Sequence, residues 1–338
     1  MGRIVLILLL ILGLAPGTWW RAPRAVPNHD QRVELAPLDL PRGCCRLGPF
    51  RLAGAWQLTS PNDDFGGYSA LLPAGGGHLL ALSDKGFALD FAKPGSAAAP
   101  ARQWPLLGDA PARKQSRDIE SATRDPATGQ VWIALEGRNA VARFAPGMTL
   151  EALRQPDEMR GWPQNTGPEA MVRLADGRFV ILSESYAGWE DGSGHPALLF
   201  AQDPAAVQRA VRFRFAGAAG YRPTDMAQLP DGRVLVLMRR LVWPMPARFA
   251  GKILLADPAA IRAGGVWPAI ELADLARPLP VDNFEALAIE PAQGPSASQG
   301  HVTVWLMSDN NDAATQRTLL WRLDLDPAAL PAKQKARR

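Results

Sequence analysis

The sequence has few cysteines and few histidines. Two cysteines in 338 residues exclude a scaffold held together by many disulfides. The four histidines, at positions 29, 78, 195 and 301, show no zinc-ligand spacing. Neither a P-loop nor a dinucleotide fingerprint is present, and residues 67–71 lack the second glycine of a nucleophile elbow. Catalytic chemistry, if there is any, must rest on other residue types.

An excess of one charge sign is also nearly absent. The formal net charge is +4, and part of it lies in a basic tail at residues 329–338. The rest of the chain is almost balanced, so we expect no nucleic-acid partner. The 47% apolar content excludes a disordered chain, and 31 glycines with 31 prolines favour many short elements joined by turns.

The chain starts with an apolar run, residues 4–14, behind Arg3. Eleven residues rise about 16 Å as a helix, too little for a ~30 Å hydrocarbon core, which favours an export signal. Counted through Trp20, the run could instead serve as an uncleaved anchor. We therefore predict a signal peptide or N-terminal anchor at residues 1–20. The protein is then exported, periplasmic or extracytoplasmic, and touches a membrane only through this segment if it is uncleaved.

A proline-rich stretch at residues 21–48 has no sustained periodicity and is predicted to be a tether. It ends near the adjacent Cys44 and Cys45. Because a disulfide between neighbouring cysteines is strained and uncommon, we expect two non-catalytic thiols at the domain entrance.

A repeated hairpin dominates the rest of the sequence. Residues 169–184 read as strand, Asp-Gly turn and strand, and the same layout begins again at Ser69, Glu120, Asp225 and Glu285. A third strand and then a proline follow each hairpin, and three of these prolines stand in Asp-Pro-Ala-Ala.

Four strands in about 50 residues, repeated, predict an all-β fold, a β-propeller of four-stranded blades. The repeats number five, with six blades as the alternative. The last repeat has no fourth strand, and we expect residues 50–58 to supply it beside residues 319–325 and close the ring. The predicted propeller domain spans residues 49–328.

The repeat places acidic residues at equivalent positions. The starts of the inner strands carry Ser69, Glu120, Glu169, Asp225 and Glu285, and the ends of the second strands carry Asp84, Glu136, Glu184, Arg239 and Asp309. Carboxylates gathered this closely raise each other's pKa unless a cation neutralises them. Oxygen donors suit Ca²⁺ best, and Mg²⁺ less well. Turn capping and pairing with neighbouring arginines remain the structural alternative.

Six short motifs follow one another in order: Phe65-Gly66-Gly67-Tyr68-Ser69, Ser83-Asp84-Lys85-Gly86, Asp118-Ile119-Glu120, Asn165-Thr166-Gly167-Pro168-Glu169, Asp282-Asn283-Phe284-Glu285 and Ser308-Asp309-Asn310-Asn311. Together they resemble the phytase-like family with esterase-like activity, a group of exported bacterial propeller proteins, over roughly residues 50–326. The resemblance implies a propeller and, by kinship with propeller phytases, a calcium-assisted phosphoester site. Propeller phytases have six blades, and family members often have glycine where Ser121, Ala170 and Ala286 stand.

Two functions fit these features. The first is an exported, metal-dependent phosphoester or ester hydrolase that acts on a small anionic or ester substrate. Its expected metal ligands are Glu120, Glu169, Glu285, Asp84 and Asp309. In its catalytic set, Glu120 or Asp309 would orient the attacking water, and Lys85 or Arg239 would hold the anion. The second is a non-catalytic propeller that binds a ligand or partner and keeps a structural metal. We expect a monomer in either case.

Overall fold

The computed structural model describes residues 2, 4–7, 9, 26–41, 45–107, 117–185, 194–206, 209–244, 247–291 and 302–333. The predicted signal or anchor lies largely outside these ranges, as do Cys44, His301 and residues 334–338 of the predicted basic tail. Among the described residues, no helix combines the length and apolar character needed to cross a membrane.

Five strands surround a central axis and form the innermost layer of the molecule. These inner strands are β4 (Tyr68–Gly75), β8 (Ile119–Arg124), β12 (Pro168–Arg173), β16 (Arg222–Gln228) and β21 (Asn283–Pro291). Each contacts the next, and β21 contacts β4, so the five strands close a ring. Each inner strand starts one sheet and pairs antiparallel with its neighbour in that sheet, and the described chain is a five-bladed β-propeller. The predicted fold and blade count are confirmed, and the alternative of six blades is wrong.

The remaining strands extend each blade outward from its inner strand. The first blade adds β5 (His78–Ser83), β6 (Phe87–Ala92) and β7 (Arg102–Pro105). The second adds β9 (Val131–Leu135), β10 (Ala140–Phe144) and β11 (Leu150–Arg154). The third adds β13 (Phe179–Ser183), β14 (His195–Phe200), β15 (Ala210–Phe215) and the parallel β19 (Val266–Trp267). The fourth adds β17 (Val234–Pro244), β18 (Ala247–Ala256) and β20 (Ala269–Leu275).

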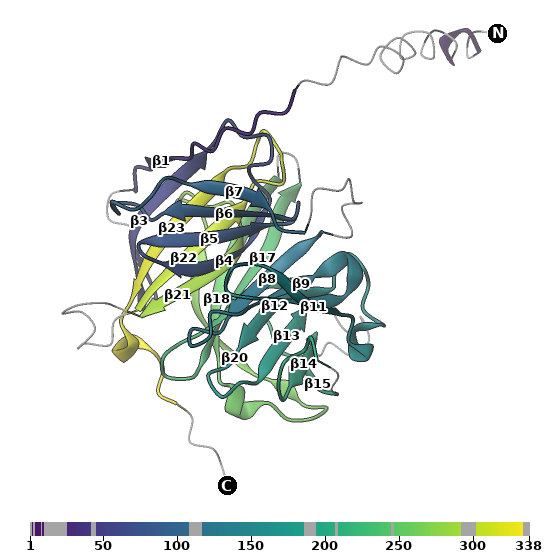
Figure 1. The fold of residues 1–338 in the computed structure, drawn as a ribbon, viewed down its shortest axis with the longest axis vertical. Coiled ribbons are helices and arrows are strands. Elements are labelled where there is room, and N and C mark those ends of the chain that lie inside the picture. Colours follow the sequence, from purple (N-terminus) through teal and green to yellow (C-terminus); the bar gives the residue numbers. More distant parts are fainter. Residues whose placement is uncertain are drawn as a thin grey trace.

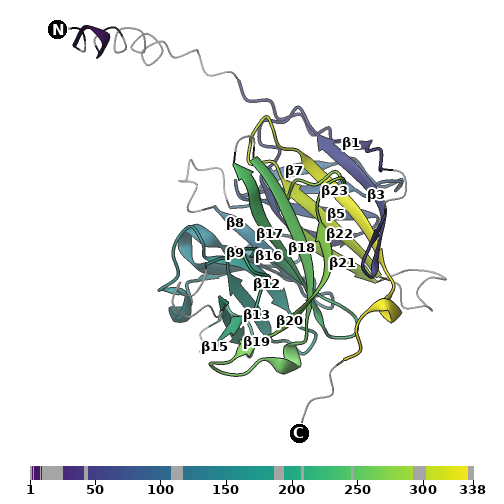
Figure 2. The same ribbon diagram turned by 180° about the vertical axis from the view of Figure 1, so that it is seen from behind.

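The fifth blade joins the two ends of the described chain. Its strands beyond β21 are β22 (Val302–Asp309), β23 (Thr318–Leu325), β3 (Phe50–Thr59), β1 (Glu34–Pro37) and β2 (Arg46–Leu47). Strand β3 pairs antiparallel with β23, from Phe50 opposite Leu325 to Leu58 opposite Thr318. Figures 1 and 2 show β3 in purple beside β23 in yellow. The predicted closure of the ring by residues 50–58 is confirmed.

The segment before β3 adds to this blade at its outer edge. Strand β1 pairs with β3, and β2 forms a short hairpin with the start of β3. Cys45 adopts a left-handed backbone with φ 101°, packs against the core and is disulfide-bonded. The expectation of a free thiol at Cys45 is therefore wrong.

The hairpin turns follow from short local signals. In the third blade Gly177 has φ +89°, a conformation that other residues rarely adopt, and Oδ1 of Asp176 accepts a hydrogen bond from Arg178 N at 3.1 Å. The turn at Asp231 and Gly232 in the fourth blade repeats this geometry. Each Asp-Gly pair fixes the register of its hairpin, as in Val172 opposite Val180.

The hydrophobic core lies between the blades. Five clusters of buried apolar side chains are formed by the described residues, and each draws its members chiefly from two neighbouring blades. Trp132 of the second blade meets Phe179 of the third, with ring centroids 4.9 Å apart. Because both faces of each sheet pack against a neighbouring blade, central strands such as β9 are buried at every position.

Candidate functional site

Every inner strand carries a β-bulge near its start. The register against the second strand shifts there, and one residue is left unpaired in each blade: Ser69, Glu120, Glu169, Thr224 and Glu285. A bulge turns the extra side chain away from the regular alternation of the strand. The five bulges lie at the same end of the ring of inner strands and bring three glutamates to it.

The structure corrects one member of this set. Asp225 was expected at the fourth position, but the register shift lies between Pro223 and Asp225 and leaves Thr224 as the extra residue. Asp225 instead pairs with Leu237, just as Ala170 pairs with Leu182 in the third blade. The equivalence was off by one residue because a bulge inserts a position that a hydrophobic pattern does not reveal.

A second set of charged residues lies beside the bulges, at the ends of the second strands. The backbone N–H groups of Asp84, Glu136 and Glu184 donate to the carbonyls of residues 67, 118 and 167, at 2.8, 2.9 and 3.2 Å. Arg239 pairs with Arg222, and Asp309 pairs with Asn283, in the same register. The second strands thus present one charged side chain from each blade to the same end of the ring.

We call these residues the acidic cluster. Its members are Asp84, Asp118, Glu120, Glu136, Glu169, Glu184, Glu285, Asp309 and Arg239. Five of its acids, Glu136, Glu169, Glu184, Glu285 and Asp309, are only 5–7% exposed. Carboxylates with so little contact with water need hydrogen bonds, arginines or a cation if they are to remain ionised.

The tightest group lies in the second blade. Carboxylate oxygens of Asp118, Glu120 and Glu136 all lie within 4.8 Å of one another. Oε1 of Glu136 also accepts a hydrogen bond from Gly167 N at 3.1 Å, which holds its side chain toward the third blade. Two oxygens bound to one Ca²⁺ at about 2.4 Å lie at most about 4.8 Å apart, so this trio can share a calcium ion.

Burial and mutual repulsion act on the acids of the cluster. Burial, reinforced by the charges of Glu285 and Glu136, raises the pKa of Glu120 well above its usual range. Burial also raises the pKa of Glu169 well above its usual range, with the charge of Glu120 adding to it. The pKa of Asp309 rises for the same reasons, burial first and then Glu285. Acids from the second, third and fifth blades therefore interact across the axis of the ring.

The half-exposed Arg222 pairs with Glu184, with Nη1 2.9 Å from Oε2, and Arg239 is the more buried cation of this cluster. Its Nη2 lies 3.0 Å from Oε1 of Glu285 and 3.5 Å from Oε1 of Glu184. Burial alone would lower the pKa of Arg239, but the charges of Glu285 and Glu184 raise this pKa above its usual range. Asn283 donates from Nδ2 to the same Glu285 oxygen at 2.7 Å. Glu285 is thus engaged on two sides, while the trio of Asp118, Glu120 and Glu136 lies outside ion-pair distance of Arg239.

Lys85, the other predicted anion-binding residue, is held to one side. Its Nζ contacts Oδ1 of Asp312 at 2.5 Å and the carbonyl of Phe65 at 3.3 Å. Of the residues expected to form the site, the structure brings Glu120, Glu169, Glu285, Asp84, Asp309 and Arg239 into one electrostatically coupled group. Lys85 is directed toward the loop after β22 instead.

Sequence reasoning missed Asp118 as a candidate ligand and gave Glu136 no metal role. The missing signal is a spacing: residues 67, 118, 167, 222 and 283 all lie two positions before a bulge residue. Two of them are glycines for a steric reason. A Cβ at Gly67 would lie 2.1 Å from Oδ1 of Asp84, and one at Gly167 would lie 2.5 Å from Oδ1 of Asn139 and 3.1 Å from Cγ of Glu136. Gly67 leaves room for the carboxylate of Asp84, and Gly167 leaves room for Asn139 and Glu136.

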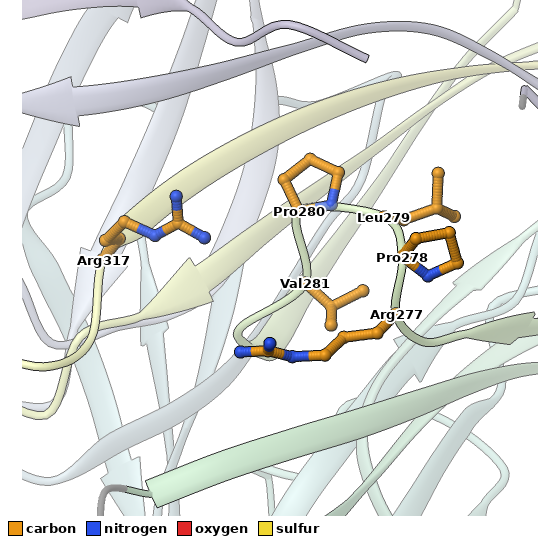
Figure 3. Close-up of a pocket in the computed structure, with 6 residues that line it drawn as sticks. All are labelled: Arg277, Pro278, Leu279, Pro280, Val281 and Arg317. Carbon is orange, nitrogen blue, oxygen red and sulfur yellow. The ribbon is translucent and has the colours of Figure 1, made fainter. Parts of the chain in front are cut away.

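A cavity of about 480 Å³ lies at the same end of the fifth blade. Residues 277–281, which precede β21, and Arg317, which precedes β23, line it. Figure 3 shows the guanidinium groups of Arg277 and Arg317 directed into the space between the two segments. Arg317 also lies near Asp282, with Nε 3.7 Å from its Oδ2. The acidic cluster therefore has these two arginines in its neighbourhood besides Arg239 and Arg222.

Comparison with known proteins gives one family match. A family model described as phytase-like, esterase-like activity of phytase, matches residues 63–312, a segment that contains the whole acidic cluster. No curated protein matches the chain. Among solved structures, the glutaminyl cyclase of Myxococcus xanthus has 14% identity and a TM-score of 0.46, over 82% of this chain and 97% of its own. A streptogramin B lyase has 9% identity and a TM-score of 0.40, over 87% and 97%.

Proposed function

The chain belongs to the phytase-like family with esterase-like activity, and from this membership we propose that it is a metal-assisted hydrolase of phosphoesters or carboxyl esters. One observation carries the proposal. Eight carboxylates from four blades converge at one end of the inner-strand ring, with Arg239 of the remaining blade among them. A structural role alone would not require so many acids with raised pKa values at one place.

The donor set of the cluster fits a calcium ion. All its candidate ligands are oxygen atoms, and the trio of Asp118, Glu120 and Glu136 meets the spacing that a shared ion needs. Asn283, fully buried next to Glu285, has an Oδ1 atom without a hydrogen-bond partner among the described residues. When bound, Ca²⁺ would supply positive charge to stabilise the oxygens of the reacting ester. Mg²⁺ fits less well because it retains several waters and requires near-ideal octahedral geometry.

The side chains of the cluster divide into holding and positioning roles. Asp118, Glu120 and Glu136 would hold the cation. Glu169 adds negative charge beside Glu136 from the third blade, and the hydrogen bond from Gly167 N keeps the Glu136 side chain in place. Asp84 and Asp309 add negative charge from the first and fifth blades, since both interact with Glu285 or Glu120. The propeller therefore fixes these groups on the strands or directly beside the strand ends before any ligand arrives.

Arg239 is the residue we assign to the anionic part of the substrate. Its Nε atom is buried and has no hydrogen-bond partner among the described residues. An arginine can hold a carboxylate or phosphoryl oxygen while its other nitrogens remain paired with protein acids. Lys85 would take this role only by releasing Asp312, and Arg277 with Arg317 would attract a second anionic group in the adjacent cavity. The substrate class is thus a small phosphoester or carboxyl ester, and an anionic group on it would bind Arg239.

A non-catalytic role is the second candidate. Arg239 already neutralises part of the charge of Glu184 and Glu285, so the cluster could hold a structural cation and bind a ligand without turnover. The two candidates differ in one measurable property, the release of product.

The test is hydrolysis by the purified protein of 4-nitrophenyl phosphate, bis(4-nitrophenyl) phosphate and 4-nitrophenyl acetate, with Ca²⁺ and with a chelator. We expect turnover of at least one ester with Ca²⁺ only. Glu120→Gln should lower it on the order of 10²-fold, as the loss of one electrostatic group in an active site does. Glu271→Gln, an exposed change on β20, is the matched control and should leave the rate unchanged. Absence of Ca²⁺-dependent turnover on every ester would favour the binding role.

Export belongs to the same proposal and rests on the apolar run at residues 4–14 behind Arg3. We propose a periplasmic or extracytoplasmic protein that acts as a monomer without nucleic acid. Fractionation of cells that express the full chain tests the location, and the mass of the purified protein in solution tests the monomer. Recovery in the cytoplasm would contradict export.

A further inference from the structure

The opposite end of the inner-strand ring contains a cavity of about 710 Å³. The second halves of all five inner strands line it, from Leu71 on β4 to Glu290 on β21. Glu120 and Arg124 lie four positions apart on β8, about 13 Å at the rise of a strand, so the cavity is separate from the acidic cluster. Exposed residues such as Pro126 and Pro230 line it as well, so solvent reaches it.

Most of the cavity wall is apolar. Side chains from every inner strand contribute to it: Leu72, Ala122, Val172, Met226 and Leu287. The volume lies in the range of small-molecule sites, which combine an apolar wall with a few polar groups that fix the orientation of the ligand. The polar groups of this wall therefore determine which ligand it takes.

The acids of the wall and one of its two arginines have partners within the protein. Asp125 forms an ion pair with Arg173, at 3.1 Å between Oδ2 and Nη2. Glu290 forms an ion pair with Lys93 at 2.8 Å and accepts a hydrogen bond from Nε1 of Trp305 at 2.9 Å. These pairs leave no acidic side chain of the wall free to attract a cation.

The amide and hydroxyl groups of the wall are also engaged. Gln228 accepts from Ala175 N at 2.7 Å and donates to the carbonyl of Gly232 at 2.8 Å. The hydroxyl oxygen of Thr123 accepts from Arg173 N at 3.0 Å. Neither side chain shares its bonds with the remaining arginine.

Arg124 differs from the other charged residues of the wall. Its Nη1 donates to the carbonyl of Pro73 at 2.6 Å, and the described residues place no carboxylate within ion-pair distance of its guanidinium group. Its Nε is buried and has no hydrogen-bond partner among them. The carboxylate of Asp90, which acts on Arg124 from a greater distance, is bound to His78 at 2.5 Å. Arg124 is thus a cation without a counterion in an apolar cavity.

We propose that this cavity is a second binding site, for a small monocarboxylate with an apolar body. A guanidinium group with free N–H donors matches a carboxylate in shape and charge. One unbalanced positive charge matches a monoanion better than a doubly charged phosphate monoester. The apolar wall takes the hydrocarbon part, which gains free energy by leaving water. This site does not depend on the function proposed for the acidic cluster.

Isothermal titration calorimetry with octanoate and with octanamide, its uncharged analogue of equal length, tests the proposal on the unmodified protein. We expect one octanoate site per chain and binding of octanamide at least about 10-fold weaker, because a hydrogen-bonded charge pair is lost. Equal affinity for the two probes, or no octanoate binding at millimolar concentration, would overturn the proposal.

Variants locate the site. Arg124→Gln should weaken octanoate about 10-fold or more and leave octanamide unchanged. Arg322→Gln, at an exposed arginine on β23 paired with Asp324, is the control and should bind octanoate as before. Glu120→Gln should also bind it normally, because the acidic cluster is not involved. Unchanged octanoate affinity in Arg124→Gln would overturn the assignment. If that variant fails to fold, the comparison of octanoate with octanamide on the unmodified protein still tests the proposal.

Discussion

Nη2 of Arg239 lies 3.0 Å from Oε1 of Glu285, and the pair joins the second strand of the fourth blade to the inner strand of the fifth. In the other four blades the position of Arg239 is acidic. The arginine therefore offsets part of the negative charge that the blades gather at one end of the ring.

Removal of this arginine should destabilise the fold. Arg239→Met leaves the buried carboxylate of Glu285 without its arginine partner and removes one of the two arginines that pair with Glu184, and breaking a buried ion pair typically costs about 3 kcal/mol or more. Arg222→Met is the matched control, because Arg222 also binds Glu184 but is half exposed. Its cost should be below about 1 kcal/mol. Urea denaturation of both variants without metal measures the difference, and equal costs would contradict it.

Asp225 should give the protein a stability that falls as pH rises. Burial raises its pKa well above its usual range, although its carboxylate accepts hydrogen bonds from Leu287 N and Met226 N. Above pH 3.8, the usual pKa of this side chain, the unfolded chain releases the proton while the folded protein keeps it, so unfolding becomes easier with increasing pH. Asp225→Asn removes this contribution and should gain stability relative to the unmodified protein between pH 4 and pH 7.

Asp176→Asn provides a control of opposite sign. A hydrogen bond with Arg178 lowers the pKa of Asp176, so its contribution to stability is lost as pH falls through the lowered value. Denaturation curves of the two variants at several pH values should therefore diverge. Parallel pH profiles would contradict the assignment of Asp225 as a buried acid that the fold keeps protonated.

The closure of the ring predicts the effect of a truncation. A chain that begins at residue 60 lacks β3 and exposes the side of β23 that it covers, including contacts of Phe50, Leu52 and Leu58. Burial of each such side chain contributes about 1.5–3 kcal/mol, comparable in sum with the whole stability of a domain. We expect this chain to lose its cooperative thermal transition. A chain that begins at residue 26 should keep it, and a native melting curve from the shorter chain would contradict the closure.

The fold could be predicted from the sequence because each blade repeats the same local signals. Turns that contain glycine, buried strands and a proline after the third strand recur from repeat to repeat, with Asp-Gly itself at residues 176–177 and 231–232. The absent last strand points to the segment at residues 50–58. The three Asp-Pro-Ala-Ala motifs have a local cause as well. Their aspartates accept hydrogen bonds from the backbone N–H two residues later, as Asp257 does from Ala259 at 2.9 Å.

The site was predictable only to the level of strand ends. The sequence placed Glu120, Glu169 and Glu285 correctly at the inner-strand starts. In the fourth blade it pointed to Asp225, whereas the equivalent residue is Thr224, because a bulge adds a residue without altering the hydrophobic pattern. Asp118 and Glu136 form the closest group with Glu120 through contacts between strands, which spacing along one strand does not encode. The contact of Lys85 with Asp312 depends on a loop and was equally hidden.

Calcium titration by calorimetry, with thermal melting in parallel, tests the central claim that the acidic cluster binds a cation. We predict heat of binding for the metal-free protein and a higher melting temperature with Ca²⁺, since a ligand that binds only the folded state stabilises it. Asp118→Asn and Glu136→Gln should each weaken binding about 10-fold or more, and Glu271→Gln should not. The Ca²⁺ concentration should reach the millimolar range, about 100 times the concentrations at which calcium sites of this kind fill. No heat of binding and no change in melting temperature under these conditions would contradict the account.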